Sequence, residues 1–228
     1  MSLRHTTSGC HNVGIGTDAG GTISTGSINI AIGCKALGCA TTTGAYNIAI
    51  GGVAMGLADT TGSNNIALGQ NAADALTSGA CNIAIGPVAL GAQTDGCDNI
   101  AIGQSALAVS ADDADNNIAI GNTALGGIDV AGHDNIALGR STMDALTSGH
   151  CNIAMGLNAL GAATVHSCSN VAIGFLAMGT GVGGGTAGQG SYNVGIGEAA
   201  LSAITTGCLL YTSPSPRDLS TSRMPSSA

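Results

Sequence analysis

The chain has 228 residues, of which 38 are glycine, 8% are charged and only 2% are aromatic. Globular cores rely on large aromatic side chains, so this composition argues against an ordinary globule and favours a stack of repeats that bury one another. The formal net charge of -8 argues against nucleic acid as a partner, and the absence of any run of 18 apolar residues argues against membrane insertion of this segment.

The first residues resemble the end of a repeat. Ser2-Leu3 stands where later repeats carry Ala-Leu, and residues 6–8 stand where they carry a threonine-rich turn. We therefore expect the natural chain to begin upstream of Met1, so that this sequence is a fragment.

A five-residue pattern, such as Asn29 to Gly33, then recurs along the chain at intervals of 17 or 18 residues, with a last interval of 23. We number its asparagine as position 0. Position +1 is always Ile or Val, position +3 is Ile, Leu or Met, and position +4 is always Gly. Alternation with β-branched residues indicates a short strand, and the glycine indicates a tight bend. The pattern begins at Asn12, Asn29, Asn47, Asn65, Asn82, Asn99, Asn117, Asn135, Asn152, Asn170 and Asn193.

A second apolar pair, Ala-Leu or Ala-Met, follows at +7 and +8, as in Ala36-Leu37. Two copies carry it three residues later, at Ala75-Leu76 and Ala145-Leu146. A polar turn with Thr, Ser, Asp and Gly then closes each unit. One unit is thus one rung, and residues 1–207 are predicted to form an all-β, parallel β-roll or β-solenoid of about eleven 17–18-residue rungs. The handedness of the coil stays open.

The repeat asparagines are predicted to stack with their amides hydrogen-bonded along the rod, as in other parallel stacks. This predicted asparagine ladder comprises Asn29, Asn47, Asn65, Asn82, Asn99, Asn117, Asn135, Asn152 and Asn170.

The aliphatic side chains at +1 and +3 share one strand face, which we assign to the inside of the coil. Position +2 then faces outward and is only Ala or Gly, a restriction that indicates close approach of another surface. We predict that this column lines the axis of a homotrimer, which would also protect strand edges. The alternative is a bare flat face on a monomer, which suits an ice-binding solenoid. The predicted axis face comprises Ala31, Ala49, Ala67, Ala84, Ala101, Ala119, Ala137, Ala154 and Ala172.

The repeat pattern stops after the turn at Thr205 to Gly207, and residues 208–228 carry three of the four prolines. Residues 208–218 resemble a conceptual translation of a transposase-type sequencing adapter, and residues 222–228 resemble the flow-cell primer that follows it. We therefore expect residues 208–228 to be a non-native, disordered tail and the natural protein to continue beyond Gly207.

The repeated motif, followed by Ala-Leu and a Thr-Thr-Gly or Thr-Ser-Gly turn, resembles the head repeats of trimeric autotransporter adhesins of the YadA type. It resembles still more the longer repeats of phage tail-fibre proteins, because the rungs here exceed the usual adhesin unit. The resemblance spans residues 1–207. It implies a trimeric parallel β-roll that works as a stalk or a binding head, and no anchor or chaperone domain is present in the sequence to decide between the two branches.

Few residues outside the repeat motif are candidates for a disulfide, a metal site or catalysis. Cys81 with Cys97, and Cys151 with Cys168, fall on consecutive rungs, where they are either bridged or unpaired small residues at turn edges. No C-x-x-C pair occurs, which argues against zinc. The turn histidines are either solvent-exposed or a metal site shared between rungs. These histidines are His11, His133, His150 and His166.

The acidic turn with Asp112, Asp113 and Asp115 either binds Ca²⁺ or is a solvated loop. The glycine-rich insertion from Gly179 to Gly190 is either a flexible loop or a receptor contact. No catalytic constellation stands out from the repeat, so we expect no enzyme activity, no cofactor and no metal.

These observations predict a structural and adhesive segment of a phage tail fibre or a bacterial surface adhesin, located outside the cell, on the cell surface or on a virion. The expected partners are two further copies of the chain and a host-surface receptor or glycan. The alternative function is that of a monomeric ice-binding β-solenoid.

Overall fold

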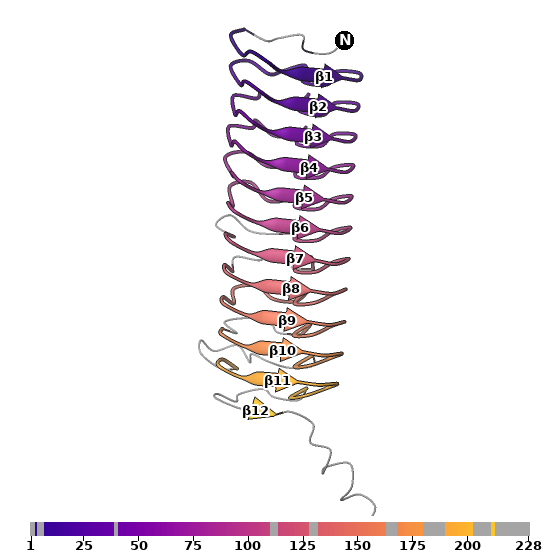
Figure 1. Ribbon diagram of the computed structural model, residues 1–228, viewed down its shortest axis with the longest axis vertical. Coiled ribbons are helices and arrows are strands. Elements are labelled where there is room, and N and C mark those ends of the chain that lie inside the picture. The colour runs from indigo at the N-terminus through magenta and orange to yellow at the C-terminus, as the bar shows by residue number, and fades with distance from the viewer. Residues whose placement is uncertain are drawn as a thin grey trace, which may run out of the picture.

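The computed structural model describes residues 3, 7–38, 41–109, 114–127, 132–162, 168–179, 190–202 and 211–212. The predicted all-β solenoid is confirmed: short strands stack one above another into a rod, with β1 near one end and β12 at the other (Figure 1). No helix occurs among these residues. The strands are β1 (Val13–Ile15), β2 (Ile30–Ile32), β3 (Ile48–Ile50), β4 (Ile66–Leu68), β5 (Ile83–Ile85), β6 (Ile100–Ile102), β7 (Ile118–Ile120), β8 (Ile136–Leu138), β9 (Ile153–Met155), β10 (Val171–Ile173), β11 (Val194–Ile196) and β12 (Tyr211–Thr212).

All twelve strands form one parallel sheet in sequence order. The register is strict, so that each repeat position lies beside the same position of the next rung; Ile100, Ala101 and Ile102 pair with Ile118, Ala119 and Ile120, for example. With about 4.8 Å between neighbouring strands, eleven rungs span roughly 50 Å. Each side-chain column therefore runs the length of the rod.

The bend after each strand is made by the glycine at +4, whose φ lies in the left-handed region, as in Gly86 at +130°. A Cβ built on Gly86 would lie 2.6 Å from the Gly103 carbonyl oxygen of the next rung. A side chain therefore has no room at this position, which explains why glycine occupies it in every copy.

The segment after the bend remains hydrogen-bonded along the rod although it is not a strand. In the third rung, Val53 and Met55 both have positive φ, at +60° and +47°. Val53 donates its backbone N–H back to the Cys34 carbonyl, and Met55 donates forward to the Ala72 carbonyl, each at 2.9 Å. Left-handed backbone in a non-glycine residue is costly, and these inter-rung hydrogen bonds offset that cost.

The core lies between the strand and this segment, and its side chains are small. The +2 alanines, the +7 alanines and the +8 leucines or methionines form one continuous buried cluster. Ala101, Ala106 and Leu107, which represent the three columns, are each 0% exposed. The interior of a 17–18-residue coil is thus narrow and in most described rungs is filled by alanine packed against one larger aliphatic side chain.

The predicted facing of the strands was therefore wrong. The nine alanines assigned to an axis between chains are buried inside their own chain, and the +1 and +3 aliphatics assigned to the core lie on the surface. Alternation establishes which residues share a face, but the width of the coil decides which face is inward. The corrected alanines are Ala31, Ala49, Ala67, Ala84, Ala101, Ala119, Ala137, Ala154 and Ala172.

Three of the described rungs carry an extra buried aliphatic side chain at +11, and the rung of β5 carries the buried Gln93 at the same position. The rung of β1 has Gly20 at +8 and places Ile23 in the core, and the rung of β4 has Ala73 at +8 and places Leu76 there. In both rungs the +11 side chain replaces volume that the small +8 residue leaves empty. The third, Leu146 on the rung of β8, is buried together with Met143 at +8.

Two residues of the C-terminal segment extend the sheet. Tyr211 and Thr212 pair in parallel with Val194 and Gly195, which differs from the expectation of disorder across residues 208–228. An open strand edge offers unpaired N–H and C=O groups to any extended segment that follows. The remaining residues of the expected tail lie outside the described part of the chain.

Candidate functional site

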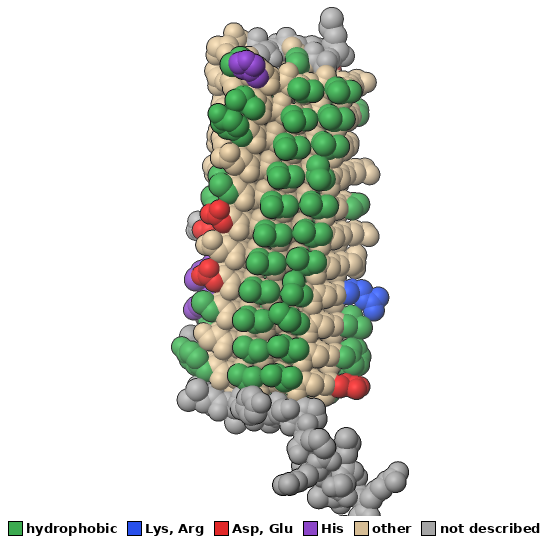
Figure 2. Space-filling view, viewed as in Figure 1, with side chains coloured by type: hydrophobic (Ala, Val, Ile, Leu, Met, Phe, Trp, Pro, Cys, Tyr) green, Lys and Arg blue, Asp and Glu red, His purple; other side chains and the backbone are tan. Residues whose placement is uncertain are grey.

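The outer face of the sheet carries two columns of aliphatic side chains, which we name the aliphatic stripe. Figure 2 shows them as adjoining rows of hydrophobic side chains along the rod. None of these side chains is buried; Val13 is 43% exposed and Ile15 is 58% exposed. The stripe consists of Val13, Ile15, Ile30, Ile32, Ile48, Ile50, Ile66, Leu68, Ile83, Ile85, Ile100, Ile102, Ile118, Ile120, Ile136, Leu138, Ile153, Met155, Val171, Ile173, Val194 and Ile196.

No charged residue interrupts the stripe, and the charged side chains visible in Figure 2 lie to its sides. The glycines at +4 border it and carry no side chain. An uncharged face of this length is unusual on a monomeric soluble protein and is typical of an interaction surface.

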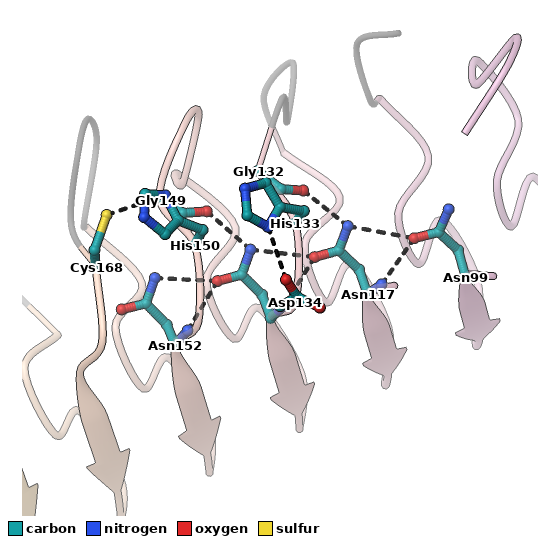
Figure 3. A network of polar contacts seen from close by, with 10 residues as sticks. Asn99, Asn117, Gly132, His133, Asp134, Gly149, His150, Asn152 and Cys168 are labelled. Atoms are coloured by element: carbon teal, nitrogen blue, oxygen red, sulfur yellow. Dashed lines mark hydrogen bonds and ion pairs between the residues drawn. The ribbon is translucent and has the colours of Figure 1, made fainter. Parts of the chain in front are cut away.

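The predicted asparagine ladder is present, and its amides are buried. Asn117 donates its backbone N–H to Asn99 Oδ1 at 2.9 Å, and its own Oδ1 accepts from the backbone N–H of Asn135 at 3.0 Å. Asn117 Nδ2 also donates to the carbonyl oxygen of Gly132 at 2.8 Å (Figure 3). The contact with Gly132 was not predicted, and it fastens the polar turn that closes this unit to the start of the unit's own strand.

The same bonding recurs along the rod, which makes the role of the column structural. Backbone N–H to Oδ1 bonds of 2.8–3.1 Å join every consecutive pair of repeat asparagines, from Asn12 to Asn193. Buried amides satisfied in this way rigidify a fold, whereas a half-satisfied one destabilises it.

Beside the ladder, at position -2, two exposed histidines and a half-buried cysteine lie on consecutive rungs (Figure 3). The rings of His133 and His150 stack with centroids 5.0 Å apart and an interplanar angle of 11°. His133 Nδ1 lies 2.8 Å from Asp134 Oδ2, and His150 Nδ1 lies 3.3 Å from Cys168 Sγ. In-register stacking thus brings together residues that are 17 or 18 positions apart in the sequence.

The other candidates do not assemble into a site. Cys81, Cys97, Cys151 and Cys168 are all free thiols, so of the two alternatives for these cysteines the structure shows the unpaired one. Within the described ranges, no group of three or more His, Cys, Asp or Glu side chains is arranged to hold a metal ion. His166, Asp112, Asp113 and most of the glycine-rich insertion (residues 180–189) lie outside those ranges.

Asp115 has a structural contact: its Oδ1 accepts the backbone N–H of Cys97 at 2.7 Å.

Two aspartate side chains are partly buried, and their burial shifts their pKa values. Burial raises the pKa of Asp74 above its ordinary value of 3.8, an effect opposed in part by a hydrogen bond from Asn71 Nδ2 at 2.7 Å. Burial also raises the pKa of Asp144, which occupies the same repeat position four rungs later. Each aspartate directly precedes an Ala-Leu pair that lies three residues later than usual, in the sequence Asp-Ala-Leu-Thr-Ser-Gly at residues 74–79 and 144–149. The rungs that place Leu76 and Leu146 in the core therefore also bury part of a carboxyl group.

Comparison with protein-family models, with curated proteins and with solved structures returned no match. No helix in the described part of the chain is long and apolar enough to cross a bilayer. The function must therefore be argued from the surface of the rod itself.

The aliphatic stripe is the feature that sequence reasoning misplaced. One signal could have located it: position +2 never exceeds alanine in size, which is the requirement of a narrow interior as much as of a close contact between chains.

Proposed function

We propose that this chain is a structural rod within a fibre or adhesin at a cell or virion surface, and that it assembles as a homotrimer through the aliphatic stripe. The observation that carries the proposal is the unbroken stripe on the outer face of β1 to β11. The resemblance to adhesin-head and tail-fibre repeats supports the same function, with attachment to a host-surface receptor or glycan as the role of the assembled rod.

A second copy of the chain fits this stripe because the partner must present apolar groups at the same axial spacing over about 50 Å. Only a parallel stack with the same rung height does so along its whole length. The stripe is two columns wide, so each column can face one neighbour, and heterologous contacts of this kind close into a ring. Three rods around an axis satisfy both columns of every chain.

The energetics favour assembly. Two side chains on each of eleven strands give 22 per chain. If each side chain loses only one methylene equivalent of exposed surface, the gain is about 0.8 kcal/mol apiece, or roughly 18 kcal/mol per chain. Association costs about 4–15 kcal/mol, so covering the stripe outweighs the loss of translational and rotational freedom.

The stripe also supports a rival function. A regular, uncharged face that stays exposed on a monomer is suited to an ordered solid surface such as ice. The rival predicts a monomer that shows thermal hysteresis.

The test is the solution mass of the intact chain, measured by sedimentation equilibrium beside the Ile102→Glu variant. We expect a trimer for the unsubstituted chain and a monomer for the variant, since a carboxylate in the middle of the stripe could be buried only at a large desolvation cost. A monomeric unsubstituted chain would overturn the trimer, and ice shaping by that monomer would establish the rival.

A further inference from the structure

Three cysteines share position -2 of the repeat, beside the asparagine ladder, and two of them form a matched pair. Cys97 and Cys168 precede Asn99 and Asn170 by two residues, and both are half-buried. They occupy the same place in the rung because the rungs are in register. A difference in their chemistry must therefore come from the groups that contact each residue.

Those surroundings differ at the backbone, where the Cys97 N–H bonds to the Asp115 carboxylate and the Cys168 N–H to the Ser191 hydroxyl, and they differ at the sulfur. Cys97 Sγ lies 3.4 Å from the backbone nitrogen of Ala80 and 3.5 Å from the carbonyl oxygen of Asp95, neither of which can accept and retain a proton. Cys168 Sγ lies 3.3 Å from His150 Nδ1. When the imidazole carries its own proton on Nε2, Nδ1 accepts the thiol proton. Cys10, the third member, is exposed and faces the Ser27 hydroxyl at 3.6 Å.

The imidazole is held in place from its other side. His133 stacks on His150, and Asp134 bonds to His133 Nδ1. All three of these side chains are exposed. The order Asp134, His133, His150, Cys168 thus orients a base beside a nucleophile, which is the arrangement that activates thiols.

We propose that Cys168 is a reactive thiol that uses His150 as its base and is modified by small-molecule disulfides. The thiol proton moves to His150 Nδ1, and the sulfur attacks one sulfur of the disulfide. The disulfide bond breaks, and the departing thiolate takes the proton from His150. The products are a mixed disulfide on Cys168 and one free small-molecule thiol. This site is independent of the aliphatic stripe and does not rest on the proposed assembly.

The test exposes the native chain to 5,5′-dithiobis(2-nitrobenzoate) at neutral pH and quantifies each modified cysteine by peptide mass spectrometry. A free thiol is only a few per cent ionised near pH 7, so complete proton transfer could raise the rate at most about thirtyfold, and we expect Cys168 to react about tenfold faster than Cys97. We also expect it to react faster than Cys151, which is more exposed. Reactivity that follows exposure alone, with Cys151 fastest, would overturn the proposal.

Two surface substitutions separate the base from its neighbour. We expect His150→Gln to lower the rate at Cys168 to that of Cys97 while leaving the Cys97 rate unchanged. His133→Gln is the matched control, because it removes a stacked imidazole that does not touch the sulfur; it should lower the Cys168 rate by less than His150→Gln does, since it removes an orienting contact and leaves the base in place. An unchanged rate at Cys168 in His150→Gln would refute the role of the base.

Discussion

The two faces of each strand differ in the size of their side chains more than in polarity. The inner column consists of nine wholly buried alanines and, on β1 and β11, a glycine, whereas the outer columns consist of larger aliphatics that remain partly exposed. An ordinary half-buried strand places its large apolar residues inside and its polar residues outside. Here the inner face of the strand admits only small residues, so the large apolar residues lie on the outer face.

Introducing a charged side chain into the buried alanine column should cause the largest loss of stability. Ala101 is wholly buried between neighbouring alanines, so Ala101→Glu places a carboxylate where neither water nor a partner can reach it. We expect a loss of more than about 5 kcal/mol and failure to fold, measured by circular dichroism and soluble yield. Ile102→Glu is the control and should keep its β signal. A folded Ala101→Glu chain would show that position +2 faces outward.

Truncating the one large core side chain of a rung should have the next largest effect. Leu107 is wholly buried, and Leu107→Ala should lower the free energy of unfolding by about 2–5 kcal/mol, since the cavity in a tightly packed coil collapses poorly. Urea denaturation provides the measurement. Val109→Ala, at a side chain that is 42% exposed, should remain within about 0.5 kcal/mol, and equal losses at both positions would contradict the assigned core.

Removing one amide from the asparagine ladder should cost about as much as a core truncation, because two buried backbone groups lose their partner. Asn117→Ala leaves the Gly132 carbonyl and the backbone N–H of Asn135 without their partner. Each unsatisfied buried group costs about 1–3 kcal/mol, and the same denaturation experiment reports it. Asn122→Ala removes an exposed asparagine with a 3.4 Å contact and should be nearly neutral. A neutral Asn117→Ala would mean that the ladder accompanies the fold without stabilising it.

The smallest expected effect is on the pH dependence of stability, through the partly buried Asp74 and Asp144. Because burial raises the pKa of Asp74 in the folded state, the folded chain binds this proton more tightly than the unfolded chain does. The resulting stability is present below the ordinary pKa of 3.8 and is lost as pH rises through the folded value. Asp74→Asn should remove this loss and flatten the dependence of stability on pH above 3.8. An unchanged pH profile in Asp74→Asn together with Asp144→Asn would contradict the burial of these carboxyl groups.

Much of the structure of one rung could be predicted from the sequence, because the same motif occurs eleven times and its invariant positions stand out. Alternation located the strands, the invariant glycine located the bend, and the invariant asparagine located the ladder. The facing of Ala101 and Ile102 could not be derived in this way, because both residues are apolar and period-two alternation is symmetric between faces. Deciding it requires the width of the coil, which depends on the backbone after the bend.

The conformation of the backbone after the bend could not be predicted from the sequence either. Val53 and Met55 adopt left-handed φ, a conformation that β-branched and long side chains rarely take. The inter-rung hydrogen bonds that hold them there exist only after the rungs have stacked. The pairing of His150 with Cys168 has the same origin, since only the register brings the two side chains together.

The most direct measurement of the central claim compares oxidation by hydrogen peroxide at two methionines of the intact chain. Met143 is wholly buried in the core, whereas Met155 belongs to the stripe and is 36% exposed in the single chain. If the stripe is covered by further copies, both methionines resist oxidation in the unsubstituted protein, and only Met155 becomes oxidised in Ile102→Glu. Equally fast oxidation of Met155 in the two proteins would show that nothing covers the stripe.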